Sequence, residues 1–166
     1  MAVSFYAAIP LMALLAIVQT AVLPHFPIAG VEPQLLFLVA LAWGLVRGLE
    51  DGLVWAFIGG LWSDLFSMAP VGLSSLAFMA AVAAAVLLQQ VMPPRRLLVA
   101  ALMAALGTLI YLVISIVVLG LLGHGLSAAG LAQLLPLFIL HMVVILPIYL
   151  LLQSLVRVLK PRRVEF

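Results

Sequence analysis

Asp64 is the residue whose type and position could do chemistry, because no other acidic side chain lies inside a long apolar segment. A carboxylate in such a segment is costly to bury, so it faces protein and often belongs to a proton or cation pathway. The alternative is structural: a carboxyl group that joins helices through hydrogen bonds. A relay needs further acids at matching depth, and the absence of a second one favours the structural or partner-contact interpretation. The expected hydrogen-bond partners of Asp64 are Gln19, Ser74 and Ser75.

The remaining residues do not indicate a metal ion, a cofactor or a reaction. His141 lies in an apolar segment, where we expect it to make hydrogen bonds between helices. His25 and His124 have no neighbours at the spacing of a metal site. The chain has no cysteine, and it contains neither a nucleophile elbow nor a glycine-rich loop with a phosphate-binding lysine. We therefore expect a protein that is not an enzyme and that binds no cofactor.

The composition indicates an integral membrane protein. Of the 166 residues, 68% are hydrophobic and only 7% are charged, whereas soluble domains carry about 25% charged residues. A globular protein of this composition could not cover its surface with polar groups. The few basic residues do not form a nucleic-acid-binding surface. The length predicts a single integral-membrane domain over residues 1–166.

Apolar segments separated by proline, glycine and charged residues predict an all-α membrane protein, a bundle of six transmembrane helices. About 20 apolar residues are needed for a full span, and two of the segments are clearly shorter. The predicted spans are residues 3–23, 34–46, 53–68, 73–91, 97–122 and 131–159.

Small residues recur at every fourth position before Asp64. Residues at this spacing share one face of a helix, and small side chains there let helix backbones approach closely in a membrane. One long helix through this region would place Arg47, Glu50 and Asp51 in the bilayer centre, so we expect a solvated turn around the two acids. The expected helix-packing or partner interface comprises Gly44, Gly48, Gly52, Gly60, Asp64 and Gly72.

The basic residues predict the orientation of the spans. With six spans, all seven lysine and arginine residues fall on one side, which predicts that both termini are cytoplasmic. Membrane lipids are one expected partner, because basic residues near the surface bind anionic head groups. A cytoplasmic protein is the alternative partner for the basic tail. The expected cytoplasmic basic anchor comprises Arg157, Lys160, Arg162 and Arg163.

The stretch from Gly52 to Phe78, GLVWAFIGGLWSDLFSMAPVGLSSLAF, resembles a characteristic region of the family of rod shape-determining protein MreD. In that family a glycine-containing helix runs into a Gly-Leu-x-x-Asp-Leu pattern, followed by a short loop and a Leu-Gly-Leu-like helix start. Val71 stands where leucine is usual. The chain length, six spans and basic C-terminus are also similar. The matching positions are Gly60, Leu61, Asp64, Leu65, Gly72 and Leu73.

The resemblance implies a non-enzymatic scaffold subunit of the machinery that elongates bacterial cells. It implies a multi-pass protein of the cytoplasmic (inner) membrane that binds MreC and supports peptidoglycan synthesis by RodA and a class B penicillin-binding protein, with MreB linked through the complex. The fold is thought to resemble the S components of energy-coupling-factor transporters. The alternative function is therefore a solute-capturing subunit of a membrane transporter. Such a pocket needs several convergent polar groups, and their scarcity here favours the scaffold.

Overall fold

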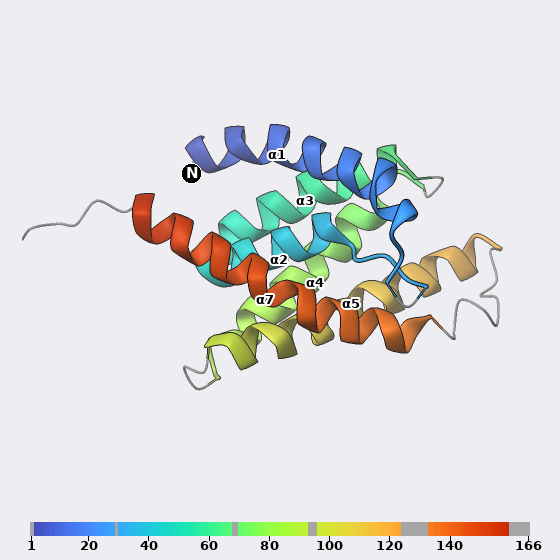
Figure 1. Cartoon of the computed structure of the whole chain (residues 1–166). Coiled ribbons are helices and arrows are strands. Elements are labelled where there is room, and N and C mark those ends of the chain that lie inside the picture. Colours follow the sequence, from blue (N-terminus) through green and yellow to red (C-terminus); the bar gives the residue numbers. More distant parts are fainter. Residues whose placement is uncertain (1, 29, 68–69, 93–95, 124–132, 160–166) are drawn as a thin grey trace, which may run out of the picture.

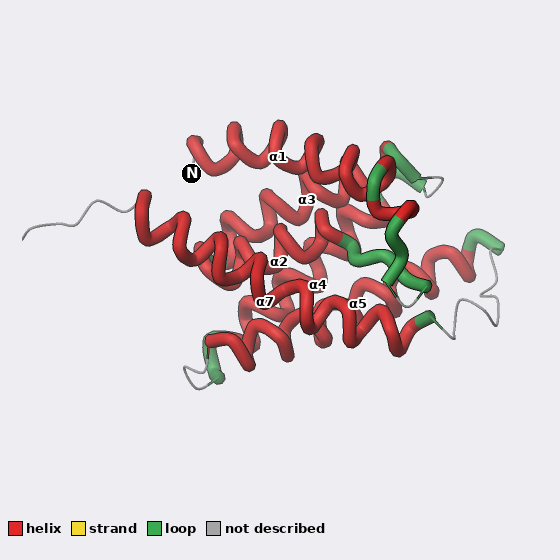
Figure 2. Tube along the Cα trace, viewed as in Figure 1, coloured by secondary structure: helices red, strands yellow, loops and turns green. Residues whose placement is uncertain are grey.

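The computed structural model describes residues 2–28, 30–67, 70–92, 96–123 and 133–159, and these are almost entirely helical (Figures 1 and 2). The described α-helices are α1 (Ala2–Ala21), α2 (Leu35–Arg47), α3 (Leu49–Leu65), α4 (Leu73–Gln89), α5 (Arg96–Leu121) and α7 (Leu134–Leu159), with a short 3-10 helix η1 (Leu23–His25) after α1.

Successive helices run in alternating directions through one bundle (Figure 1). The start of α1, the turn between α2 and α3, and the end of α7 therefore lie at the same end of the bundle. Arg47, in the last turn of α2, and Arg157, in the last turn of α7, are both at this end. Arg95, Lys160, Arg162 and Arg163 lie outside the described residues.

Helix α2 is the central element of the bundle. Every residue from Leu36 to Leu45 is buried, and α2 packs against α1, α3, α4, α5 and α7. Its 13 residues measure about 20 Å along the axis, which is shorter than the roughly 30 Å hydrocarbon core. Because neighbouring helices surround α2, its apolar residues are buried by protein.

The first helix, α1, makes a narrow contact with the rest of the bundle. Ala8, Met12 and Ala16 are fully buried, whereas most of the large side chains between them are exposed. This spacing of four residues places the buried side chains on one helical face. A Cβ atom at Gly59 of α3 would lie 3.3 Å from the Met12 sulfur, so the Met12 side chain of α1 packs directly against Gly59.

Three of the described segments are long and apolar enough to cross a membrane: Tyr6–His25, Leu97–Leu121 and Leu134–Val158. Two further apolar helices, α2 and α4, are shorter. These findings agree with an all-helical membrane protein, and they establish three candidate spans where the sequence predicted six.

The turn between α2 and α3 is tighter than the sequence predicted. Helix α3 begins at Leu49 instead of residue 53, so Glu50 and Asp51 lie in its first turn, where the helix dipole favours acidic side chains. Asp51 accepts a 3.0 Å ion-paired hydrogen bond from Arg47. The predicted hairpin is present, with Gly48 as its single connecting residue, and Glu50 is exposed, whereas Asp51 lies in the helix and pairs with Arg47.

Candidate functional site

The carboxylate of Asp64 holds the N-terminus of α4. Its Oδ2 atom accepts a 2.7 Å hydrogen bond from the backbone N–H of Gly72, and Oδ1 accepts one of 3.0 Å from the N–H of Ser74. The first backbone N–H groups of a helix have no partner within the helix and carry partial positive charge. Asp64 is 2% exposed, so a buried carboxylate is paired here with buried backbone donors.

Gly60 brings α3 close enough to α4 for this contact. A Cβ atom at Gly60 would overlap the Cα and N atoms of Ser75 in the first turn of α4. Gly60 lies one helical turn before Asp64 and therefore on nearly the same face of α3. The hydroxyl of Ser75 donates a 3.2 Å hydrogen bond to the carbonyl oxygen of Phe57, which adds a second link between the two helices.

Gly72 provides the backbone conformation that directs its N–H toward Asp64. Its φ of 100° lies in the region that residues with a Cβ atom rarely adopt. A Cβ atom there would meet nothing within 4 Å, so backbone conformation, not packing space, accounts for glycine at this position.

The N-terminus of α2 is held in a similar way by side chains from other helices. His141 of α7 accepts a 3.1 Å hydrogen bond through Nε2 from the backbone N–H of Gln34. Gln19 of α1 accepts one of 3.3 Å from the N–H of Leu36 and donates one of 2.9 Å to the side chain of Gln34. Polar side chains of α1 and α7 thus meet at the start of the central helix.

The hydrogen bonds around His141 indicate its tautomer. Because Nε2 accepts from Gln34, the proton of a neutral imidazole belongs on Nδ1. Nδ1 lies 2.7 Å from the hydroxyl oxygen of Thr108, which itself donates to the carbonyl oxygen of Ala104 at 2.7 Å. His141 and Thr108 are both fully buried. The prediction that His141 makes hydrogen bonds between helices is confirmed.

The predicted glycine face has two parts with different roles. Gly44 and Gly52 face each other across the α2–α3 turn, where a Cβ atom on Gly52 would lie 2.6 Å from the Cα of Gly44. Gly48 does not lie on this packed face. It forms the turn with a φ of 104° and has open space around it. The indole rings of Trp43 and Trp55 stack across the same pair of helices, 4.5 Å apart.

Asp64 is surrounded by different groups from those the sequence suggested. Gln19 pairs with Gln34 and Leu36 instead of Asp64, and the Ser75 hydroxyl bonds to a carbonyl. Of the three expected partners, Ser74 alone bonds to Asp64, and it does so through its backbone. The main-chain donors were missed because any residue type can supply them. Gly44, Gly52, Gly60 and Asp64 are buried within the chain, where a partner protein could not reach them.

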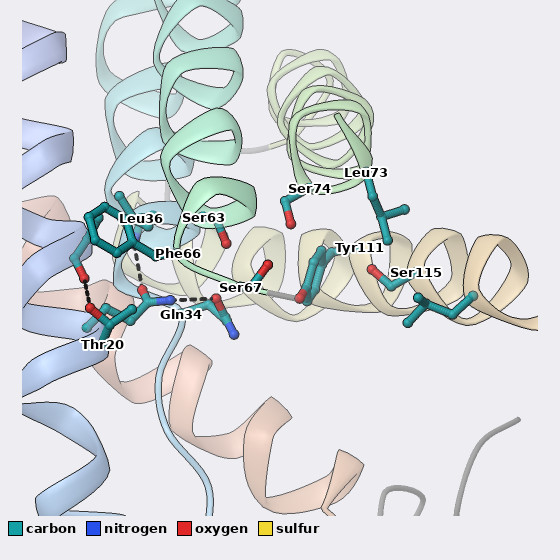
Figure 3. Close-up of a pocket in the computed structure, with 13 residues that line it drawn as sticks. Thr20, Gln34, Leu36, Ser63, Phe66, Ser67, Leu73, Ser74, Tyr111 and Ser115 are labelled. Carbon is teal, nitrogen blue, oxygen red and sulfur yellow. Dashed lines mark hydrogen bonds between the residues drawn. The ribbon is translucent and has the colours of Figure 1, made fainter. Parts of the chain in front are cut away.

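A cavity of about 210 Å³ opens beside these capped helix ends (Figure 3). It lies between the end of α1, the start of α2, the end of α3, the start of α4 and the second half of α5. Most of its wall is apolar, and it also carries hydroxyl and amide side chains, among them Gln19, Gln34, Ser63, Ser67, Tyr111 and Ser115. Sequence reasoning missed this cavity, because its lining residues come from five separate segments.

The described residues include no group of three or more histidine, cysteine or acidic side chains that could hold a metal ion. Among the described residues, every buried side-chain nitrogen and oxygen atom has a hydrogen-bond partner. Asp64, Gln19 and His141 use such bonds to join one helix to the start of another.

No curated protein and no solved structure matches the chain. A family model does match it, over residues 1–159, and its description is rod shape-determining protein MreD. The matched region contains both capped helix starts and the close contact between α3 and α4. The chain, a helical membrane protein, therefore belongs to the family of rod shape-determining protein MreD.

Proposed function

We propose that this protein is a non-enzymatic scaffold of the cell-elongation machinery, which binds MreC and supports peptidoglycan synthesis by RodA and a class B penicillin-binding protein. The proposal is supported by the hydrogen bonds of the polar side chains inside the bundle, which join helices to one another. Asp64, Gln19 and His141 bond to the starts of two helices, so these groups serve the architecture of the bundle. A rigid bundle in the membrane is what a scaffold requires.

The proposed arrangement in the membrane is a six-span bundle in the inner membrane, similar to the S components of energy-coupling-factor transporters. The alternating helix directions and the position of Arg47 and Arg157 at one end support it. Both termini would then be cytoplasmic. The basic residues at the end of α7 and beyond it would anchor the chain to anionic lipids.

The exposed sides of the outer helices are the surfaces available to MreC and other membrane partners. On α1, Leu14 and Ile17 are 58% and 51% exposed, and on α7, Ile139 and Val143 are 56% and 59% exposed. In the bilayer these faces contact either lipid acyl chains or another membrane helix. A single-span partner could pack there without disturbing the buried caps.

Co-purification of the full-length protein with MreC tests the proposal. We expect the two proteins to elute as one complex in mild detergent. Leu14→Trp should weaken the complex if MreC contacts the exposed face of α1, and Val143→Trp should weaken it if MreC contacts the exposed face of α7. Leu65→Trp is a matched control, because Leu65 is equally exposed at 59% but lies at the end of α3. Failure to recover any complex from cells that keep their rod shape would contradict the scaffold.

Solute capture is a second candidate function, which the cavity favours because several hydroxyl and amide side chains lie in its wall. Ligand pockets usually measure about 300–1,000 Å³, so the cavity is small for a vitamin-sized solute. A transporter subunit would retain a specific small molecule through purification, and its loss would abolish uptake while leaving cell shape unchanged.

A further inference from the structure

The cavity at the ends of α1, α3 and α4 has an uncharged lining. Among the described residues, those that line it include no lysine, arginine, histidine, aspartate or glutamate. The nearby Asp64 is not part of the wall, and its two oxygens accept hydrogen bonds from the start of α4. An anion placed in this cavity would lose water without gaining an opposite charge, which is costly. Phosphate and carboxylate groups are therefore poor ligands.

The polar groups of the wall suit a ligand that both donates and accepts hydrogen bonds. Serine and tyrosine hydroxyls can do either. The Gln19 amide already bonds to Gln34, and the Tyr111 hydroxyl bonds to Ser115. A ligand would therefore use the donor and acceptor positions that these groups keep beside their internal bonds. Ser63 of α3, Ser67 just after α3 and Ser115 of α5 contribute hydroxyls from different segments (Figure 3). Their convergence on one space matches a ligand with several hydroxyl groups spread around a ring.

The apolar part of the wall gives such a ligand a surface to lie against. Phe66 and Tyr111 supply aromatic rings, and in Figure 3 Ser63 and Ser67 are drawn between them. Rings pack against the C–H faces of a sugar while the hydroxyls around its edge reach polar groups. The volume of about 210 Å³ corresponds to about seven water molecules at about 30 Å³ each. This is enough space for one six-membered ring with its substituents.

We propose that this cavity binds an uncharged, hydroxyl-rich group of about one sugar ring. The group could belong to a glycolipid in the surrounding membrane or to a free sugar, since both present the same chemistry. This binding site goes beyond the scaffold function and does not depend on it, because a scaffold can hold its partners with the cavity empty.

Native mass spectrometry of the full-length protein tests the proposal, in a detergent whose head group contains no sugar. The probes are monoglucosyl diacylglycerol and diacylglycerol with the same acyl chains. We expect at least fivefold greater retention of the glycolipid. We expect Ser63→Leu and Ser115→Leu, which fill the cavity, to reduce that retention at least fivefold. Ser154→Leu is the matched control, because Ser154 is an exposed serine of α7 outside the cavity, and it should retain the glycolipid like wild type.

Equal retention of the two lipids by the wild-type protein would overturn the proposal, and so would undiminished retention by folded cavity variants. Gel filtration establishes that each variant is folded. If a leucine variant aggregates, Ser63→Ala and Ser115→Ala replace it, with an expected loss of about fivefold for one hydrogen bond of about 1 kcal/mol. Adding free glucose distinguishes the two sources: displacement of the glycolipid indicates recognition of the sugar alone, and persistence indicates recognition of the lipid-borne form. Both results support the site.

Discussion

The carboxylate of Asp64 accepts a 2.7 Å hydrogen bond from the backbone N–H of Gly72, eight residues later in the chain. It also accepts from Ser74, within the first turn of α4. A side chain at the end of one helix thereby supplies the cap that the next helix lacks, since Gly72 has no side chain to cap α4 itself. This relationship explains why an acid can be stable so deep in an apolar chain.

The first prediction concerns the order of stability at Asp64. Both carboxylate oxygens face backbone donors, so Asp64→Asn would turn an NH₂ group toward an N–H and leave a buried donor unpaired, at about 1–3 kcal/mol. Asp64→Leu would leave both donors unpaired and cost more. We expect thermal unfolding in detergent to rank wild type above Asn and Asn above Leu. Glu50→Gln, at an exposed acid of α3, is the control and should change stability little. Equal midpoints for wild type and Asp64→Asn would contradict the capping role.

The second prediction concerns the contact between Gly60 and Ser75. Gly60→Ala would force the first turn of α4 away from α3, and overpacking of this kind typically costs about 1–3 kcal/mol. Gly120→Ala is the matched control, because Gly120 is a helical glycine of α5 with nothing within 4 Å of an added Cβ. That variant should be neutral or gain up to about 1 kcal/mol from helix propensity. Similar unfolding midpoints for the two variants would show that the close approach is not needed.

The periodic features of the sequence predicted the helices well. Hydropathy and the prolines located each described helix, with ends within a few residues of those observed, because long apolar segments admit few other structures. The spacing of the glycines identified Gly44, Gly52 and Gly60 as residues near other backbones. The same spacing included Gly48, which forms a turn. Glycine suits both a packed helix face and a tight turn, so a pattern of one small residue in every four does not distinguish them.

The tertiary partners could not be predicted in the same way. The depth of Gln19 matched that of Asp64, but Gln19 bonds to the start of α2 instead. Depth along the membrane normal does not say which of several helices is adjacent. Gln34 and Thr108 were also missed, because single polar residues in apolar segments give no spacing pattern. Their only sequence signal is their rarity in an otherwise apolar chain.

The third prediction tests the hydrogen bonds of His141. His141→Leu would leave the N–H of Gln34 without its acceptor and remove the partner of the Thr108 hydroxyl, so we expect a loss of about 1–3 kcal/mol. His25→Leu is the control, because His25 is an exposed residue of η1. Thermal unfolding of the two purified variants measures the difference. Indistinguishable midpoints would mean that His141 contributes no net stability to the start of α2.

The last prediction concerns the orientation of the bundle in the membrane. The helices alternate in direction, and Arg47 and Arg157 lie at the same end, which the positive-inside rule assigns to the cytoplasm. Reporter domains fused after Gln90 and after Leu159 should therefore be cytoplasmic, and one fused after Leu122 should be external. The short helices α2, α3 and α4 decide the outcome, because a fusion after Gln90 is cytoplasmic only if an even number of segments crosses before it. An external reporter after Gln90, with the Leu159 fusion still cytoplasmic, would contradict the six-span arrangement, because the four helices before Gln90 would then not all cross the bilayer.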